Sequence, residues 1–405
     1  MKYIKRVAEE VIRKQEKMFK TILVTGARQV GKTTMLKNIK PDINYITLDD
    51  MLLNQSAKEE PNLFFKSNKP PIIIDEIQYA PELLRNIKMI VDSSEEKAMF
   101  YLTGSQKFNL MKDVSESLAG RIGIINLLGL SLREIKEVNF NKPFMPTEEY
   151  LKLRENCKVD VSYDEIWEII QKGSMPALYQ EESNVEMFYA MYVSTYIERD
   201  VRKLAQVGDE MLFLKFMTAL ASRIGQLLNL ESISNEIGIS VPTATRWLSI
   251  LQTSNIIYIL EPYYNNIMKR AIKTPKVYFL DTGLAAYLTK WKNKDVLESG
   301  TMAGNYFENY VIVEIIKSHY NSGELRPPVY FYRDKEKREI DLIIEENGRL
   351  YPIEIKKSAN PSKDMVKNFK VLEKVKEVGE GAVICMYDNV IDLDEKNKAI
   401  PYSLL

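Results

Sequence analysis

The stretch GARQVGKTT, residues 26–34, constrains the fold of this 405-residue chain more than any other feature. It fits the phosphate-binding pattern G-x-x-x-x-G-K-[ST], which requires a buried strand before it and a helix after it. The apolar run TILVT precedes the pattern, and TTMLKNIK, with helical spacing, continues from it. Glycines let backbone N–H groups close around phosphate oxygens, and a helix N-terminus favours negative charge. The stretch therefore predicts a nucleotide site at the edge of a parallel α/β sheet.

The roles expected within this loop follow from the chemistry of a triphosphate. Lys32 is expected to reach the β- and γ-phosphates of ATP, and the Thr33 hydroxyl is expected to bind Mg²⁺. ATP and Mg²⁺ are therefore the predicted cofactors. The residues predicted to bind the nucleotide are Gly26, Ala27, Arg28, Gln29, Val30, Gly31, Lys32, Thr33, Thr34 and, after a later strand, Ser105.

A second, acidic element follows the apolar run PIII. Asp75 and Glu76 stand at the end of this predicted strand. There Asp75 can hold Mg²⁺ through water, and Glu76 can act as general base on the attacking water. The alternative is a carboxylate pair that caps the following helix. Together with the phosphate loop, this element favours ATP hydrolysis.

Two further elements complete the predicted ATP site. FYLTGS gives a third strand that ends in Thr103 and Ser105, which can sense the γ-phosphate; the alternative is an ordinary strand exit. Arg121, in ESLAGRI, precedes another strand and is predicted to stabilise transition-state charge within the chain or on a neighbouring subunit. The alternative for Arg121 is a surface ion pair. Arg28, inside the phosphate loop, is an equally supported candidate for the same role.

Composition narrows the class of protein. Lys and Arg together number 56, as do Asp and Glu, so any basic surface for nucleic acid must be local. The two cysteines, Cys157 and Cys385, are far apart and lack metal-ligand spacing, which fits a reducing compartment. The single histidine, His319, argues against a His-based metal site or triad. No segment reaches the roughly 18 uninterrupted apolar residues of a membrane span, and the N-terminus lacks the apolar core of a signal peptide. The sequence therefore predicts a cytoplasmic protein with no membrane partner.

Hydrophobic periodicity divides the chain into four predicted domains. Residues 1–135 alternate short apolar runs with helical patterns, which is typical of a parallel sheet with helices on both faces. Residues 136–226 are mostly helical, residues 227–291 contain a helix–turn–helix pattern, and residues 292–405 mix helix and strand. The predicted fold class is therefore α/β at both ends of the chain, with a helical region between them.

The helix–turn–helix pattern in LESISNEIGISVPTATRWLSILQ breaks at Gly238-Ile239-Ser240. If the second helix enters a DNA groove, Thr243, Thr245 and Arg246 face the DNA while Trp247 packs inward. The residues expected to contact phosphates just downstream are Lys269, Arg270, Lys273 and Lys276. The alternative is a module used for protein contacts, because the second helix carries few charges.

The stretch EIDLIIEENGRLYPIEIKK predicts a β-hairpin around Asn347-Gly348, the strongest sequence signal for a type I′ turn. In the register set by that turn, Asp341 faces Glu354 and Glu339 faces Lys356. Two opposed carboxylates about 5 Å apart repel each other, so a divalent cation or Lys356 is expected to offset the cost. The alternative is a solvated hairpin face.

Several motifs, taken in order, resemble those of prokaryotic AAA-type ATPases that carry a C-terminal domain of unknown function. These motifs are LVTGARQVGKTT, PIIIDEIQYAPELL, YLTGSQKF, SLAGRIGIINLLGLSLREI, GSMPALY and YIERDVRKL. The resemblance covers nearly the whole chain. It implies an AAA-like P-loop core in residues 1–135, a lid-like helical region in 136–226 and a winged helix in 227–291. Residues 292–405 are implied to fold like the PD-(D/E)XK nucleases.

The resemblance also implies roles for the hairpin. Asp341 matches the acid that closes one strand of a PD-(D/E)XK fold, and Glu354-Ile355-Lys356 matches the (D/E)-x-K triplet on its neighbour. Glu308, from the preceding helix, is the expected additional acid, and Glu314 is the less favoured one. The three carboxylates would hold Mg²⁺, while Lys356 would stabilise developing negative charge or position the water.

Two functional hypotheses follow from these sites. In the first, the chain is an Mg²⁺-dependent ATPase that acts on double-stranded DNA, with a winged helix that grips the duplex and a C-terminal domain that cuts or holds it. In the second, the chain is a nucleotide-gated regulatory switch that binds protein partners, and its nuclease-like domain is inactive. A homo-oligomer is compatible with both. Glu76 argues against a pure nucleotide binder, which needs no poised base.

Overall fold

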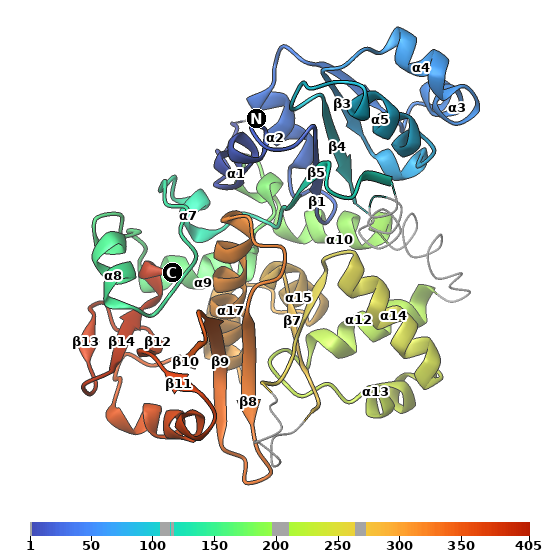
Figure 1. The fold of residues 1–405 in the computed structure, drawn as a ribbon. Coiled ribbons are helices and arrows are strands. Elements are labelled where there is room, and N and C mark those ends of the chain that lie inside the picture. The colour runs from blue at the N-terminus through green and yellow to red at the C-terminus, as the bar shows by residue number, and fades with distance from the viewer. Residues whose placement is uncertain (1, 106–113, 115–116, 197–209, 264–272) are drawn as a thin grey trace. The chain divides into compact units, whose positions relative to one another are not determined.

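The computed structural model describes residues 2–105, 114, 117–196, 210–263 and 273–405 (Figure 1). The chain divides into two compact units. The first comprises Met1–Leu130, Thr253–Asn255 and Tyr320–Leu325, and the second comprises Ser131–Gln252, Ile256–His319 and Arg326–Leu405. The three regions expected after residue 135 therefore share the second unit, while two short late segments join the first.

The first unit is built on a parallel five-stranded sheet with strand order β2-β3-β4-β1-β5. Its strands are β1 (Thr21–Thr25), β2 (Asn44–Thr47), β3 (Ile72–Asp75), β4 (Phe100–Gly104) and β5 (Ile122–Asn126). Its helices include α1 (Ala8–Gln15), α2 (Lys32–Ile39), α3 (Met51–Glu59), α4 (Pro61–Ser67), the 3₁₀ turn η1 (Ile77–Tyr79) and α5 (Leu83–Asp92). The predicted parallel sheet is confirmed. The sheet order also places β4 between the phosphate-loop strand β1 and the acidic strand β3.

Burial on both faces explains why these strands read as apolar runs in the sequence. Every residue of β1, β3 and β4 is buried, which is the pattern of a parallel sheet covered by helices. One core cluster joins Leu23, Ile72, Ile74 and Leu102 to Leu84 of α5. Each fully buried aliphatic side chain of this kind contributes about 1.5–3 kcal/mol. The packed sheet is thereby a firm base for the loops at the carboxyl ends of its strands.

The late segments of the first unit complete its N-terminal part. Asn255 Nδ2 donates to Asn126 Oδ1 at the end of β5 over 3.1 Å, and both residues are buried. Gly323 lies against α1, where a Cβ added to it would sit 3.0 Å from Val11 Cγ1. The first unit is therefore discontinuous in sequence.

The second unit begins with a helical part. Its elements are α7 (Leu132–Ile135), α8 (Glu148–Glu155), α9 (Tyr163–Lys172), the 3₁₀ turn η2 (Pro176–Tyr179), α10 (Val185–Tyr196), α12 (Glu210–Ala221), α13 (Leu230–Ile237), α14 (Val241–Thr253), β6 (Ile257–Leu260), β7 (Lys276–Phe279), α15 (Thr282–Leu288) and α16 (Lys294–Ser299). Strands β6 and β7 form an antiparallel pair. The helix–turn–helix pattern is confirmed as α13 and α14.

The break between α13 and α14 has a local cause. Gly238 takes the left-handed conformation, with φ +82°, that commonly ends a helix. Ser240 then accepts a hydrogen bond from the Thr243 N–H over 3.2 Å, as a helix N-cap does. Trp247 of α14 is buried with its ring edge-on to Phe213 and Phe216 of α12. Helices α12 and α14 therefore share one small aromatic core.

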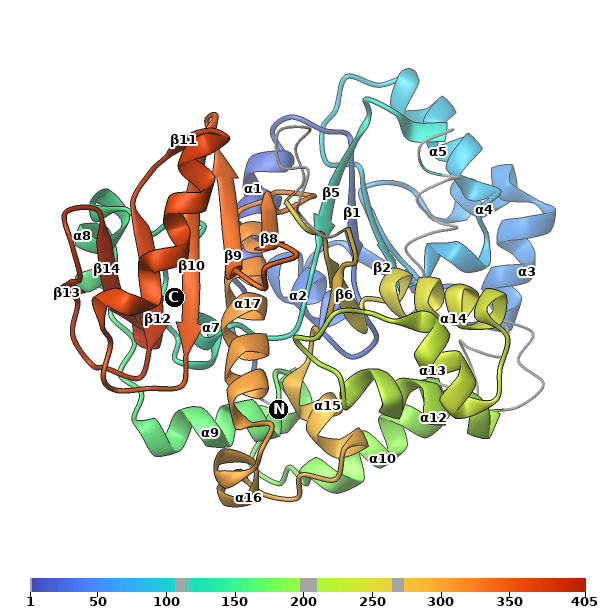
Figure 2. The ribbon, with the colours of Figure 1, turned by 90° about the horizontal axis from the view of Figure 1, so that it is seen from below.

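A mixed sheet forms the rest of the second unit, with order β13-β14-β12-β10-β9-β8 and β11 paired to β10. Its elements are α17 (Ala303–Asn321), β8 (Val329–Arg333), β9 (Glu339–Glu346), β10 (Arg349–Lys356), the 3₁₀ helix η4 (Lys363–Lys374), β11 (Glu377–Val378), β12 (Gly381–Cys385), β13 (Ile391–Asp392), β14 (Asn397–Pro401) and the 3₁₀ turn η5 (Tyr402–Leu404). In both views α17 lies beside β9, and η4 lies across β9, β10 and β12 (Figure 2).

The predicted hairpin is confirmed as β9 and β10. Asn347 and Gly348 both have positive φ, +49° and +80°, as a type I′ turn requires. The pairing runs from Arg349↔Glu346 to Ile353↔Leu342 in the predicted register. Against β8, however, the register of β9 shifts by one residue beside Asp341, between the pairs Tyr330↔Ile343 and Tyr332↔Ile340. A bulge of this kind re-aims a side chain.

Membrane-spanning helices and cysteine pairing can both be examined in the described part of the chain. None of its helices has the length and apolarity needed to span a membrane. Cys157 and Cys385 are both free thiols.

Gly26, at the end of β1, has a backbone that only glycine fits. Its φ is +151°, and an added Cβ would lie 2.1 Å from the carbonyl oxygen of Leu127. We expect Gly26→Ala to lower the free energy of unfolding by more than about 2 kcal/mol. Gly120→Ala is the matched control, because Gly120 also has positive φ but nothing lies within 4 Å of its added Cβ. The control is expected to cost about 1 kcal/mol. Equal losses in urea unfolding would show that backbone conformation, and not the collision with Leu127, sets the cost.

Candidate functional site

The phosphate loop connects β1 to α2 through two left-handed residues. Gln29 has φ +61°. Gly31, with φ +91°, comes immediately before Lys32, the first residue of α2. Lys32 is 6% exposed, and its Nζ donates to the carbonyl oxygens of Gly26 at 3.0 Å and Ala27 at 2.8 Å. The loop therefore curls around the ammonium group at the start of a helix.

The Asp75 carboxylate lies directly beside the first turn of α2. The Thr33 hydroxyl donates to Asp75 Oδ1 over 2.8 Å, and the Thr103 hydroxyl of β4 donates to the same oxygen. Tyr45 of β2 donates to Asp75 Oδ2 over 2.9 Å. Burial, and then the hydrogen bond to Asp75, raise the pKa of Tyr45 above its usual value, so the phenol stays a donor. The two predicted magnesium-site residues, Thr33 and Asp75, are therefore brought together.

Glu76 stands one residue further along, in a left-handed conformation with φ +59°. Such a conformation is uncommon outside glycine and is concentrated at functional sites. The Glu76 N–H donates to Thr103 Oγ1 over 3.1 Å, while its Oε2 accepts from Gln78 and, over 3.4 Å, from Ser105. The predicted base and the predicted sensor residues therefore meet at one edge of the sheet.

Three residues of this site were not predicted from the sequence in their observed roles. Tyr45 and Gln78 hold the two carboxylates, and Arg6 anchors the loop. The buried Arg6 guanidinium donates to the Val30 carbonyl at 2.7 Å and the Leu128 carbonyl at 2.7 Å. A polar tyrosine inside the run NYIT was the available signal for Tyr45. Nothing in the sequence around Arg6 distinguishes it from a surface arginine.

The residues at this edge fit a magnesium–nucleotide complex. The Thr33 hydroxyl and the Asp75 carboxylate are oxygen ligands of the kind Mg²⁺ prefers, and they already lie within hydrogen-bond distance. The loop turns its backbone around a lysine at a helix N-terminus, which is the arrangement that binds phosphate. Arg28 and Thr34 lie on the same loop and on the first turn of α2.

The structure places Arg121 away from this edge. It precedes β5, and β5 begins opposite Thr21, at the start of β1, so Arg121 lies at the amino ends of the strands. Its guanidinium pairs with the Asp92 carboxylate, with Nε 2.5 Å from Oδ1. The prediction that Arg121 acts on the nucleotide of its own chain is wrong, and the surface ion pair is what the structure shows. Its role on a neighbouring subunit stays a prediction.

The residues predicted to read DNA lie where the helical pattern placed them. Thr245 and Arg246 are exposed on α14, Thr243 is half-buried, and Trp247 is buried. Of the four downstream cations, Lys273 is exposed. Lys269 and Arg270 lie outside the described residues, as do residues 197–204 of the YIERDVRKL motif. The prediction that the fourth, Lys276, contacts phosphates is wrong, because its side chain is 2% exposed.

The carboxylates of the C-terminal hairpin are buried. Asp341 and Glu354 are 7% and 8% exposed, so the alternative of a solvated hairpin face is wrong. Asp341 Oδ2 accepts the N–H of Ile355 over 2.8 Å, and Lys356 Nζ lies 2.6 Å from Glu354 Oε1. Burial, with the charge of Asp341, raises the pKa of Glu354 to about 8.

Two lysines occupy the expected metal site. Lys276 Nζ lies 3.2 Å from Glu308 Oε1 and 2.6 Å from Glu339 Oε1, while Lys356 holds Glu354. Among the described residues, no three His, Cys, Asp or Glu side chains are grouped so that they could hold a metal ion. The expected set of Glu308, Asp341 and Glu354 therefore does not fit Mg²⁺ in this arrangement. Glu314, the less favoured acid, instead pairs with Lys317 over 2.9 Å and lies buried.

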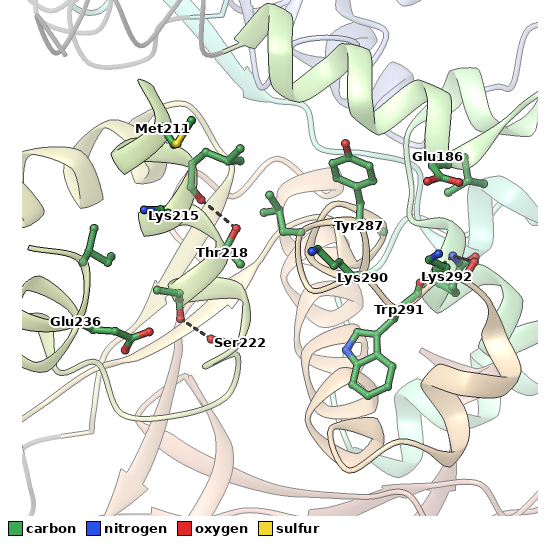
Figure 3. A pocket seen from close by; sticks show the side chains of 18 residues that line it. Glu186, Met211, Lys215, Thr218, Ser222, Glu236, Tyr287, Lys290, Trp291 and Lys292 are labelled. Atoms are coloured by element: carbon green, nitrogen blue, oxygen red, sulfur yellow. Dashed lines mark hydrogen bonds between the residues drawn. The ribbon is translucent and has the colours of Figure 1, made fainter. Parts of the chain in front are cut away.

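A separate cavity of about 980 Å³ lies between α12 and α15 (Figure 3). Its charged lining carries both signs, with Lys215 and Lys290 against Glu186 and Glu236. The hydroxyls of Thr218 and Ser222 are already bonded to backbone carbonyls, Thr218 Oγ1 to Leu214 O over 3.0 Å and Ser222 Oγ to Ala219 O over 3.0 Å. The lining therefore favours no single class of ligand.

Family models match three parts of the chain. A family model described as an AAA domain matches residues 18–136. Residues 18–136, which carry the phosphate loop and are called the AAA domain below, are therefore similar to this family. Two models described as domains of unknown function match residues 163–295 and residues 303–405.

Individual proteins resemble the chain beyond the AAA domain. An uncharacterised protein of Mycobacterium tuberculosis is 28% identical over 345 residues, which cover 84% of this chain and 71% of that protein. Among solved structures, the Walker-type ATPase of Pyrococcus abyssi is 15% identical with a TM-score of 0.44, covering 71% of this chain and 96% of that one. The Holliday junction branch migration motor RuvB of Thermotoga maritima is 17% identical with a TM-score of 0.30, covering 62% and 86%.

The Arg6 anchor of the phosphate loop yields a prediction. Arg6→Met leaves the carbonyls of Val30 and Leu128 without this donor, which is expected to cost about 2–3 kcal/mol in the free energy of unfolding. ATP binding is expected to weaken several-fold, because Val30 belongs to the phosphate loop. Urea unfolding and titration with a fluorescent ATP analogue measure the two effects. Arg13→Ala is the control, since its exposed side chain pairs with Glu9 at 3.7 Å and is expected to contribute less than about 1 kcal/mol. Unchanged ATP affinity in a folded Arg6→Met variant would show that the anchor does not shape the loop.

The position of Arg121 in the AAA domain yields a second prediction. Arg121→Ala is expected to leave ATP turnover within about twofold of the parent protein, because only an exposed ion pair with Asp92 is lost. Turnover is measured over a range of protein concentrations. A fall of about tenfold or more at concentrations where chains associate would instead establish a role at a subunit interface.

Proposed function

We propose that the chain binds and hydrolyses ATP with Mg²⁺ and that this cycle is coupled to double-stranded DNA. The observation that carries the ATPase part is the 2.8 Å contact between the Thr33 hydroxyl and Asp75, with Glu76 next in the chain. The AAA domain match over residues 18–136 supports the same reading. A pure nucleotide binder would need no carboxylate in the position of Glu76.

The AAA domain supplies each role of the reaction from its own residues. Lys32 and the N–H groups of the loop bind phosphate oxygens, and Thr33 and Asp75 would hold Mg²⁺. The metal, when bound, supplies positive charge that neutralises the phosphates. Glu76 accepts the proton of the attacking water, and its hydrogen bonds from Gln78 and Ser105 fix where the carboxylate points.

The proposed DNA surface is built on α14. The order of α12, α13, α14 and the β6–β7 pair supports a winged helix, a module in which the last of the three helices would enter the major groove. Thr245 and Arg246 are exposed on that helix, and Lys273 is exposed just before β7. Duplex DNA is favoured over single strands because α14 is exposed, whereas residues 210–263 and 273–291 carry no exposed aromatic side chain on which single-stranded bases could stack.

The burial of Lys276 favours the second hypothesis for the C-terminal region. Because lysines already pair with the hairpin carboxylates, the proposed chemistry is confined to the ATP site, and the nuclease-like region is inactive as a metal enzyme in this arrangement. A nucleotide-gated switch with protein partners would use the same ATP cycle. A cytoplasmic location and assembly into a homo-oligomer accompany both versions of the proposal.

ATP hydrolysis with and without Mg²⁺ and duplex DNA tests this function. Lys32→Ala and Glu76→Gln are each expected to reduce hydrolysis by at least about 100-fold. Glu76→Gln should still bind ATP, because the amide keeps the shape of the side chain while losing the base. A variant of Lys32 that hydrolysed ATP at the parent rate would contradict the site.

The DNA part is tested separately with Arg246→Ala. Duplex DNA is expected to stimulate hydrolysis, less so as salt rises, and Arg246→Ala is expected to weaken that stimulation by several-fold. Lys152→Ala removes one charge from an exposed pair on α8 and serves as the matched control. An intact ATPase that no duplex stimulates would favour the switch that binds proteins.

A further inference from the structure

The two oxygens of the Asp75 carboxylate are held by different parts of the first unit. Oδ1 accepts from the Thr33 hydroxyl of α2 over 2.8 Å and from the Thr103 hydroxyl of β4. Oδ2 accepts from the Tyr45 hydroxyl of β2 over 2.9 Å. A carboxylate held through one oxygen can still turn about its Cβ–Cγ bond, because that torsion is broad. The Tyr45 hydroxyl, at the second oxygen, restricts this turning.

The position of Tyr45 follows from the register of the sheet. β2 is the edge strand next to β3, and Tyr45 pairs with Ile73 while Thr47 pairs with Asp75. Side chains two residues apart on a strand share a face, so Tyr45 and Asp75 lie on the same side of the sheet. The tyrosine hydroxyl therefore reaches the carboxylate from one pair further back along the neighbouring strand.

The ring of Tyr45 has a contact of its own, apart from the hydroxyl. Lys37 Nζ lies 3.4 Å from the centre of the ring, which is a cation–π contact. Lys37 follows Thr33 by four residues on α2, and residues four apart lie on one face of a helix. One face of α2 therefore contacts Asp75 through Thr33 and Tyr45 through Lys37. Removal of the hydroxyl alone leaves the ring contact in place.

The charge of Asp75 is left available by these partners. Its three donors, Thr33, Thr103 and Tyr45, are hydroxyl groups, which carry no charge. They fix the direction of the carboxylate without forming an ion pair with it. The Asp75 side chain is buried, and a buried charge is costly until it is paired. The arrangement therefore favours a cation at the oxygen that faces Thr33.

We propose that the Tyr45 hydroxyl is a positioning group for the magnesium site. It holds Oδ2 of Asp75 so that Oδ1 stays directed at Thr33, and it thereby raises the affinity of the nucleotide-loaded protein for Mg²⁺. The inference rests on the proposed function, in which Thr33 and Asp75 would hold the metal. Partners that orient metal-binding side chains typically contribute about 10–100-fold in metal affinity.

The affinity of the full chain for a fluorescent, non-hydrolysable ATP analogue tests the proposal. It is measured with saturating Mg²⁺ and again with EDTA, and the ratio of the two dissociation constants is the gain in affinity that the metal brings. Tyr45→Phe is expected to reduce this gain by about tenfold and to leave the affinity in EDTA within about twofold of the parent value. A merely structural role of Tyr45 would weaken both affinities together.

Tyr101→Phe is the matched control. Tyr101 is a buried tyrosine of β4 whose hydroxyl also donates to a carboxylate, Glu16 Oε1, over 2.9 Å. A lysine likewise lies over its ring, with Lys40 Nζ 5.5 Å from the ring centre. This variant is expected to keep the parent gain, because the lost bond does not involve Asp75. Tyr45→Leu, which also loses the ring over Lys37, is expected to match Tyr45→Phe.

The contrary outcomes separate this inference from the proposed function. An undiminished gain in Tyr45→Phe would overturn the inference, as would a loss of the gain in Tyr45→Leu alone, which would assign the role to the ring. Circular dichroism checks that each variant is folded; the change to Phe removes one oxygen atom from a half-buried residue of an edge strand. A parent protein that binds the analogue equally well with Mg²⁺ and with EDTA would contradict the magnesium site of the proposed function as well.

Discussion

The Asp75 carboxylate is the point through which the parts of the nucleotide site are joined. Thr33 of α2 and Thr103 of β4 share one of its oxygens, and Tyr45 of β2 takes the other. Thr103 also receives the N–H of Glu76, so β4 fixes Asp75, the proposed magnesium ligand, and Glu76, the proposed base, together. Such donors are in place before any substrate arrives, which is how preorganised sites avoid the cost of reorganisation. The position of β4 between β1 and β3 is what makes this arrangement possible.

The phosphate loop, the β9–β10 hairpin and helices α13 and α14 could be predicted because local sequence patterns determine them. The phosphate loop needs a glycine at a left-handed position and a lysine at a helix start, and both are readable in nine consecutive residues. The register of the β9–β10 hairpin follows from Asn347-Gly348 alone. The helices α13 and α14 likewise follow from a glycine break and a serine cap. In each case the residues that determine the geometry are neighbours in the chain.

The wrong predictions, for Arg121 and Lys276, have the opposite cause, because the partners of both residues are distant in the sequence. The sequence predicts Arg121 to be a catalytic arginine, but in the structure it pairs with Asp92, which lies far from it in the chain. Lys276 reads as a phosphate contact in a basic stretch, yet its partners Glu308 and Glu339 come from α17 and β9. Burying a charge is costly unless it is paired. Only the tertiary structure shows that the pairing exists, and sequence spacing has no means of ordering the strands that create it.

The contact between Asn255 and Asn126 has a consequence for biosynthesis. A ribosome releases the chain from its N-terminus, and domains generally fold as units as they emerge. Here the first unit has its strands early, but the end of β5 lacks Asn255, and α1 lacks the segment around Gly323, until those later residues have been made. Completion of the first unit is thereby tied to the translation of Asn255 and Gly323, so chains truncated before these residues leave that unit unfinished.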